Sequence, residues 1–139
     1  MDPYHLERFI AAQAAVLDQV RRELRVGEKR SHWMWYIFPQ LAGLGRSGMA
    51  QKFAIASREE AEAYLSHPAL GPTLRELVGI VNEVEGRSIE QIFGYPDHLK
   101  FHSSVTLFAE VGADNAVFLA ALQKYFSGKP ERRTLELLK

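Results

Sequence analysis

Residues 31–48 read SHWMWYIFPQLAGLGRSG, an aromatic block with both tryptophans of the chain followed by a glycine-spaced loop. Seven of the eight residues 33–40 are apolar or aromatic, and so many large side chains cannot all face water. The block is therefore predicted to be a central element of the core. Ser31 is placed to cap a two-turn helix that Pro39 ends.

On such a helix one face is shared by Trp33, by Tyr36 or Ile37, and by Gln40. A buried tryptophan or tyrosine needs a partner for its N–H or O–H, which draws polar groups inward. Pockets for small molecules are commonly lined in this way, so we expect this face to contact a ligand. His32 beside it has two interpretations: a histidine that makes one hydrogen bond at the rim of the core, or a catalytic group.

Outward from this block, the N-terminal segment predicts one helix over residues 3–26. Asp2 is a suitable cap, Pro3 suits the first helical position and Gly27 suits the exit. Apolar residues recur there at intervals of three and four, which gives one buried stripe.

Further along the chain, capping and spacing patterns predict more helices. Ser57 and Ser88 each begin a capping box, and a glycine–proline pair at 71–72 introduces a helix between them. Residues 96–111 are interpreted as helical, although VTLFAEV also alternates like a strand, and Asp114 is expected to cap the next helix. The tail offers one last half-buried turn. Residues 1–139 therefore predict an all-α, single compact domain of about six to seven helices with one Gly-rich loop.

Composition narrows the class of protein. A chain of 139 residues with 47% hydrophobic and 24% charged residues is ordinary for one soluble domain. Seventeen basic and seventeen acidic side chains cancel, so no net field attracts nucleic acid or an anionic membrane. The absence of cysteine excludes disulfides and thiolate chemistry. The N-terminus lacks the features of a signal peptide and no stretch is long enough to span a bilayer, so we expect a cytoplasmic protein.

The glycine loop at residues 43–48 satisfies G-x-G-x-x-G, the dinucleotide-binding pattern. That pattern requires a preceding strand and a surrounding parallel sheet, but Pro39 interrupts the approach and no second β-α-β unit follows. The glycines are more simply explained by a tight loop that needs positive φ. A second interpretation is an anion site, in which Arg46 and Ser47 join the exposed backbone N–H groups.

The stretch PDHLKFHSSVTLFAE at residues 96–110 carries a second polar face. Wound as a helix, it aligns Leu99, His102, Ser103 and Thr106 beside an apolar stripe. These side chains either satisfy the backbone or buried water, or they contact a ligand.

His32 and His102 are the candidates for proton transfer, if the protein is an enzyme. No diagnostic catalytic motif is present, and the residues do not decide between binding and catalysis. His98 and His102 are four residues apart, but without a third ligand in the pattern they predict no metal site, and no cofactor is expected.

Basic residues concentrate in RRELRVGEKR at positions 21–30. Cations at a helix end complement its dipole, which explains them without a ligand. The alternative is a positive rim, ending at Arg30, that attracts a phosphate or carboxylate.

Four stretches of the chain together resemble the bacterial domain-of-unknown-function family numbered 1810 in its series. They are SHWMWYIFPQ, GLGRS, EAEAYLSHPALG and IFGYPDHLKFHSSVTLF. The resemblance runs from near Phe9 to the closing RTLELL and implies a small, single-domain, mainly helical protein. It implies no activity and no catalytic residues. A "calpastatin" label on some members is set aside, because that inhibitor is disordered whereas this composition is that of a folded protein.

Taken together, these patterns predict that the SHWMW and HSS segments face one another across a pocket for a small anionic or nucleotide-like ligand. The residues expected to contact it are Arg30, Ser31, His32, Trp33, Tyr36, Gln40, Arg46, Ser47, His102, Ser103 and Thr106. The alternative is a protein-interaction or homodimerisation module that uses exposed aromatics of residues 33–38. DNA contact through residues 21–30 is disfavoured by the zero net charge.

Overall fold

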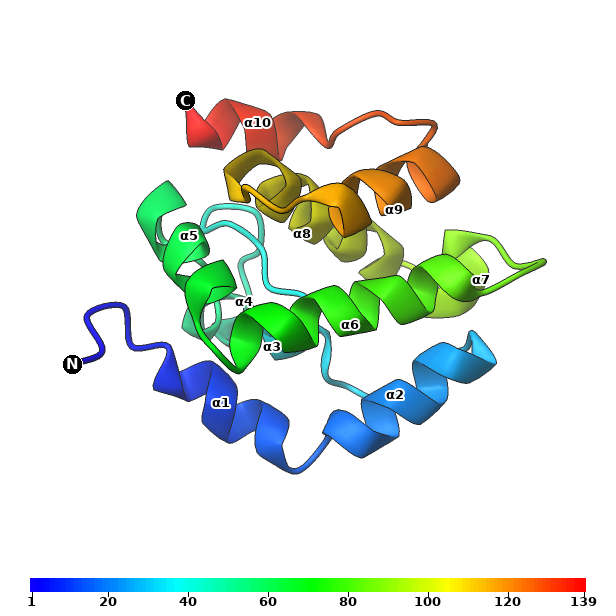
Figure 1. Cartoon of the computed structure of the whole chain (residues 1–139), viewed down its shortest axis with the longest axis horizontal. Helices are drawn as coiled ribbons and strands as arrows, with labels where there is room; N and C mark the ends of the chain where they lie inside the picture. Colours follow the sequence, from blue (N-terminus) through cyan, green and yellow to red (C-terminus); the bar gives the residue numbers. More distant parts are fainter.

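α8 (Asp97–Val111) runs through the centre of the molecule and is packed against on several sides (Figure 1). Phe101 and all seven residues of 103–109 are buried. This is the segment whose pattern was compatible with a strand, and the structure resolves it as a helix. A helix that is surrounded by other elements is buried on all faces, which explains why its hydrophobic pattern was not clearly periodic.

The computed structural model describes all 139 residues and contains ten helices and no strands, which confirms the predicted all-α fold. Seven of the helices have at least seven residues; the other three are short. Apart from α8 they are α1 (Glu7–Ala14), α2 (Leu17–Val26), α3 (Met34–Ile37), α4 (Gly48–Lys52), α5 (Arg58–Ser66), α6 (Leu70–Glu83), α7 (Ile89–Phe93), α9 (Ala116–Phe126) and α10 (Arg132–Leu138). None of these helices is both long enough and apolar enough to cross a bilayer.

The expected single helix over residues 3–26 is wrong, because the chain turns at residues 15–16. α1 packs against α3, where the Gln13 amide donates to the Tyr36 carbonyl, whereas α2 packs against α6. One straight helix cannot follow both surfaces, so the turn lets the buried stripe continue on two elements (Figure 1).

The capping predictions divide into two groups. Ser57 and Ser88 cap α5 and α7 as expected, with the full capping box at Ser88. Ser31 does not cap α3, which is a single turn, because its N–H and O–H both donate to Glu23. Asp114 caps nothing: α9 begins at Ala116, and the Asp114 carboxylate lies 4.0 Å from Arg75.

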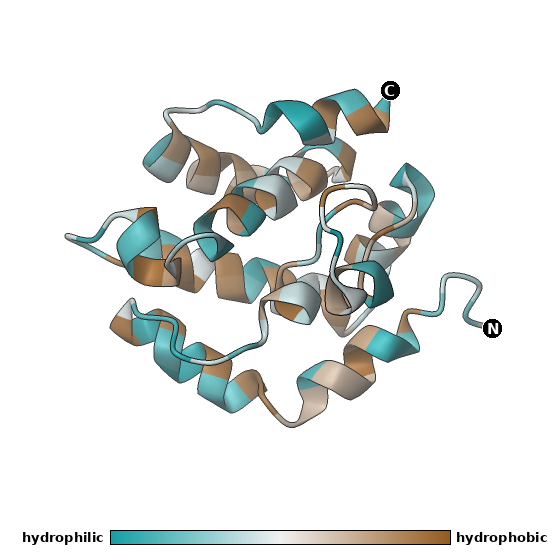
Figure 2. Ribbon diagram, turned by 180° about the vertical axis from the view of Figure 1, so that it is seen from behind, coloured by the Kyte–Doolittle hydropathy of each residue, from teal (hydrophilic) through white to brown (hydrophobic).

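The loop after α3 is held in place by an isolated parallel bridge between Leu41 and Ile55. The Ile55 N–H donates to the Gln40 carbonyl and the Ala42 N–H donates to the Ile55 carbonyl, both at 2.8 Å. In Figures 1 and 2 the loop lies between α5 and α8 and beneath α10. It therefore comes close to the C-terminal helix, which is far away in sequence.

Candidate functional site

Trp33, predicted to face a ligand, is only 1% exposed and donates its indole N–H to the Glu23 carboxylate at 3.1 Å. The same carboxylate accepts hydrogen bonds from the backbone N–H groups of Arg30 and Ser31 and from the Ser31 hydroxyl. The Gln19 amide adds a further bond at 3.0 Å. Glu23 thus supplies the polar partner that the aromatic block requires, and it does so within the protein.

The hydrogen bonds keep the Glu23 carboxylate ionised. Burial raises the pKa of this carboxyl, but the donors from Arg30, Ser31, Trp33 and Gln19 outweigh that effect and bring the pKa below its ordinary value. Glu23 is therefore a charged structural acceptor that fixes the connection between α2 and α3.

The neighbouring predicted residues lie on the surface of this connection. Arg30 is exposed and pairs with Glu28 at 3.2 Å, and His32 is exposed without a hydrogen bond to the protein. Tyr36 is half-buried, its ring lies 5.2 Å from that of Phe53, and burial raises the pKa of its hydroxyl. None of these side chains lines the groove described below.

The HSS segment of α8 is used largely to attach the C-terminal part of the chain. His102 stacks on the Phe126 ring at 3.9 Å, and its Nε2 lies 2.8 Å from the Lys129 carbonyl oxygen. This acceptor assigns the hydrogen to Nε2 in the neutral ring. Nδ1 has no partner within the protein.

Ser103 and Thr106 hold Glu131, which caps α10. The Ser103 hydroxyl is 3.3 Å from a Glu131 oxygen, and the Glu131 N–H donates to the Thr106 hydroxyl at 2.9 Å. The Glu131 carboxylate also accepts bonds from Thr134 and from the Arg133 N–H. These contacts correspond to the interpretation in which the polar strip satisfies the backbone, and they fix α10 against α8.

Glu131 resembles Glu23 in its electrostatics. Burial raises the pKa of its carboxyl, but the bonds from Thr134, Arg133 and Ser103 bring the pKa below the ordinary value. Its charge is therefore largely satisfied by donors from α8 and α10.

Beside this network lies an open hollow of about 340 Å³, which we call the charged compartment. It lies between α8, α10 and the loop after α3, and Leu44, Pro96 and Leu99 form its apolar edge. Its polar lining consists of Gln40, Lys100, His102, Ser103, Glu131 and Arg133.

A second hollow of about 180 Å³, the apolar compartment, borders the same loop and α4. Its apolar lining consists of Trp35, Leu41, Ala42, Ala50, Phe53 and Ala54. Gln40 and Gly45 line both compartments, so the two hollows are neighbours at these residues. We call the two together the Gln40 groove.

Of the predicted ligand residues, Gln40, His102 and Ser103 line this groove. Thr106 lies beneath it and is fully buried. Ser47 caps α4 by accepting from the Ala50 N–H, and Arg46 is exposed outside the lining.

The groove also contains residues that the sequence analysis did not select: Trp35, Lys100, Glu131 and Arg133. Lys100 lies on α8, one turn before Ser103 and Ser104, so its place on the same helix as the HSS segment was a usable signal. Glu131 and Arg133 carry no local signal, because only the return of α10 over the loop brings them there.

The alternative prediction, a protein-interaction module, requires exposed aromatic side chains within residues 33–38. Within residues 33–38, only Trp35 and Tyr36 are half-buried and the others are buried. The most exposed large apolar side chains lie elsewhere, with Tyr95 at 80%.

His98, considered with His102 for a metal, is buried, and its Nδ1 lies 3.3 Å from the Gly94 carbonyl. No group of three or more His, Cys, Asp or Glu side chains is arranged to hold a metal ion.

Comparison with known proteins gives a family and a structural relative. The family model described as "Protein of unknown function (DUF1810)" matches residues 3–138. The chain is also similar to the conserved hypothetical protein Rv1873 from Mycobacterium tuberculosis, whose crystal structure was determined at 1.38 Å. The two share 56% identity and a TM-score of 0.97, over 99% of this chain and 98% of the other. A search of curated proteins finds no match.

Proposed function

The chain belongs to the DUF1810 family of proteins of unknown function, and we propose that it binds a small anionic ligand in the charged compartment of the Gln40 groove. The observation that carries this proposal is the meeting of Lys100, His102 and Arg133 around one open hollow. Pockets for small molecules have volumes of roughly 300–1,000 Å³, and the volume of this hollow lies in that range.

The cations of this compartment exceed the anions available to neutralise them. Lys100 lies 3.3 Å from Asp97, but Asp97 also pairs with the buried ammonium of Lys29 at 2.8 Å. One carboxylate therefore serves two ammonium groups. Arg133 makes only a 3.4 Å contact with the Gly43 carbonyl through its side chain, so most of its donors are free for a ligand.

The one carboxylate in the lining does not cancel this attraction. Glu131 already accepts bonds from Ser103, Thr134 and the Arg133 N–H, so its charge is stabilised inside the protein. A guanidinium that offers a fork of donors binds carboxylate or phosphate well. Arg133 is accordingly the residue on which affinity depends most.

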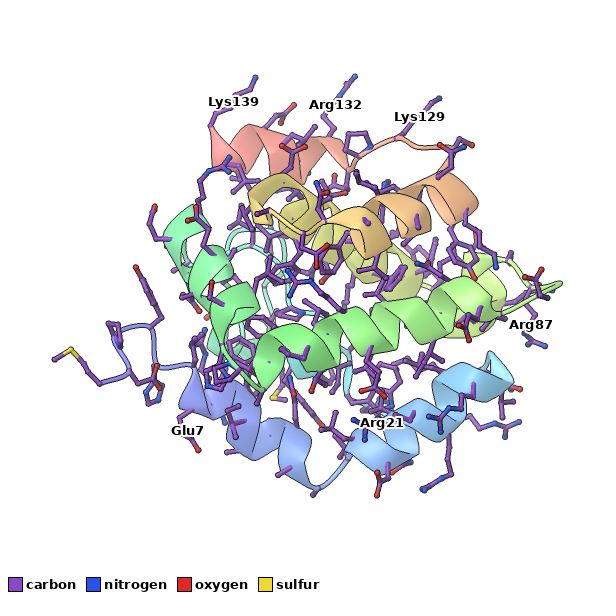
Figure 3. The ribbon with its side chains drawn as sticks, viewed as in Figure 1. Glu7, Arg21, Arg87, Lys129, Arg132 and Lys139 are labelled. Carbon is purple, nitrogen blue, oxygen red and sulfur yellow. The ribbon has the colours of Figure 1, made fainter.

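The test is isothermal titration calorimetry with inorganic phosphate, ribose 5-phosphate and nucleoside monophosphates. Removing a charge-assisted bond to the anion costs about 1.5 kcal/mol, so Arg133→Gln should weaken binding about tenfold. Arg132→Gln is the matched control, because Arg132 is the adjacent residue and points away from the molecule (Figure 3). Absence of binding by every probe, or equal losses in the two variants, would contradict the proposal.

A further inference from the structure

The apolar compartment differs from the charged one in lining and size. At about 180 Å³ it has the scale of one ring system, whereas whole drug-sized molecules occupy pockets of roughly 300–1,000 Å³. Trp35 is half-buried at its edge and Phe53 is buried at its base. Apolar and aromatic surfaces of this kind favour a flat, uncharged ring.

Gln40 lies at the junction of the two compartments and is half-buried, yet its side-chain amide makes no hydrogen bond within the protein. Four of the other glutamines use their amides internally: Gln13, Gln19, Gln51 and Gln91. The remaining one, Gln123, is exposed. Gln40 is therefore the glutamine whose amide is both partly enclosed and free.

The backbone of Gln40 is fixed even though its amide is free. Its carbonyl accepts the Ile55 N–H at 2.8 Å, and the next bond of this bridge joins Ala42 to Ile55. A side chain on a fixed backbone loses less entropy when a ligand binds, so its hydrogen bonds contribute more to selectivity.

Lys100 connects the two compartments. Its ammonium lies 5.1 Å from the centroid of the Trp35 ring, which lines the apolar compartment, while Lys100 itself lines the charged one. An anionic group bound near Lys100 is thus only a few bonds away from a ring held near Trp35.

From this arrangement we propose that the ligand is a nucleoside phosphate, with its base in the apolar compartment, its phosphate near Lys100 and Arg133, and the base edge hydrogen-bonded to the Gln40 amide. This inference rests on the proposed function, since it assigns the ligand class of the same groove. A carboxamide offers an acceptor beside a donor, which matches the donor–acceptor edges of nucleobases. Sugar phosphates lack such an edge and a flat ring.

The experiment compares the four nucleoside 5′-monophosphates with ribose 5-phosphate by calorimetry. At least one nucleotide should bind about tenfold or more tightly than ribose 5-phosphate, because only the nucleotide fills the apolar compartment. Gln40→Leu should reduce this advantage to about twofold. Gln123→Leu is the control, because Gln123 is exposed and lines neither compartment.

The outcomes separate the two proposals. Equal affinity for ribose 5-phosphate and all four nucleotides would overturn the nucleoside assignment while leaving an anion site intact. Equal losses in Gln40→Leu and Gln123→Leu would also overturn it. Absence of binding by every probe would overturn the anion site itself. Because the Gln40 amide bonds no protein atom, Gln40→Leu should retain the wild-type melting temperature, which shows that any loss is local.

Discussion

Glu23 and Glu131 play similar parts in two regions that differ in what surrounds them. Each carboxylate accepts bonds from a backbone turn and from nearby side chains, and each has a pKa below the ordinary value despite partial burial. Glu23 is enclosed by the aromatic block, where Trp33 is 1% exposed. Glu131 borders an open hollow of about 340 Å³. Polar groups drawn inward by a sequence pattern therefore indicate a ligand site only where open space remains beside them.

The comparison predicts that Glu23→Ala is the more damaging of two matched substitutions. It leaves the Trp33 N–H and the donors of residues 30–31 without their acceptor in an enclosed place, which costs about 3 kcal/mol of unfolding free energy. Glu131→Ala should cost about 2 kcal/mol, because water from the groove can reach the freed donors. Urea denaturation measures both.

Glu136→Ala serves as the control, because Glu136 is exposed on α10 and its side chain makes no hydrogen bond within the protein. A larger loss for Glu131→Ala than for Glu23→Ala would show that the groove network is the more enclosed of the two.

The same contrast explains which features of the fold and of the site could be predicted from the sequence. Local chemistry was sufficient for the helical class and for the caps at Ser57 and Ser88, since these depend on neighbours within four residues. Of the residues predicted to contact a ligand, Gln40, His102 and Ser103 line one hollow, whereas His32 and Trp33 do not.

The predictions that failed concern residues whose contacts come from other elements of the fold. The Trp33 indole was expected to meet a ligand, but its partner is Glu23, ten residues earlier, on a helix expected to continue unbroken from residue 3. Arg133 and Glu131 enter the site only through the position of α10 over the loop. No pattern in the tail specifies where that helix docks.

Acidification should weaken both networks. A carboxyl whose folded pKa is lower than its unfolded value stabilises the fold above the unfolded pKa, and this stability is lost as pH falls through the folded pKa. Since the ordinary glutamate value is 4.5, the unfolding free energy should decline as pH falls below about 4.5. The loss per carboxyl should be smaller than that of the alanine variants, because protonation leaves both oxygens in place.

Denaturation at pH 7 and pH 3.5 measures this dependence. Glu23→Gln and Glu131→Gln should each reduce the difference between the two pH values without abolishing it. Asp2 and Glu76 also have lowered pKa values, through the Glu7 and Leu6 N–H groups and through Arg21 respectively. An unchanged difference in both variants would show that neither network titrates with the fold.

The smallest effect separates two adjacent serines of α8, both of which are buried. The Ser103 hydroxyl joins the Leu99 carbonyl and Glu131, whereas the Ser104 hydroxyl makes no hydrogen bond within the protein. Ser103→Ala should therefore cost about 1 kcal/mol, and Ser104→Ala should be nearly neutral. Ser103→Ala should also speed limited proteolysis between α9 and α10, because Glu131 then holds α10 to α8 by fewer bonds. Equal stability and equal cleavage rates in the two variants would mean that the Ser103 hydroxyl adds nothing to the attachment of α10, and that Thr106 and Thr134 are sufficient to hold Glu131.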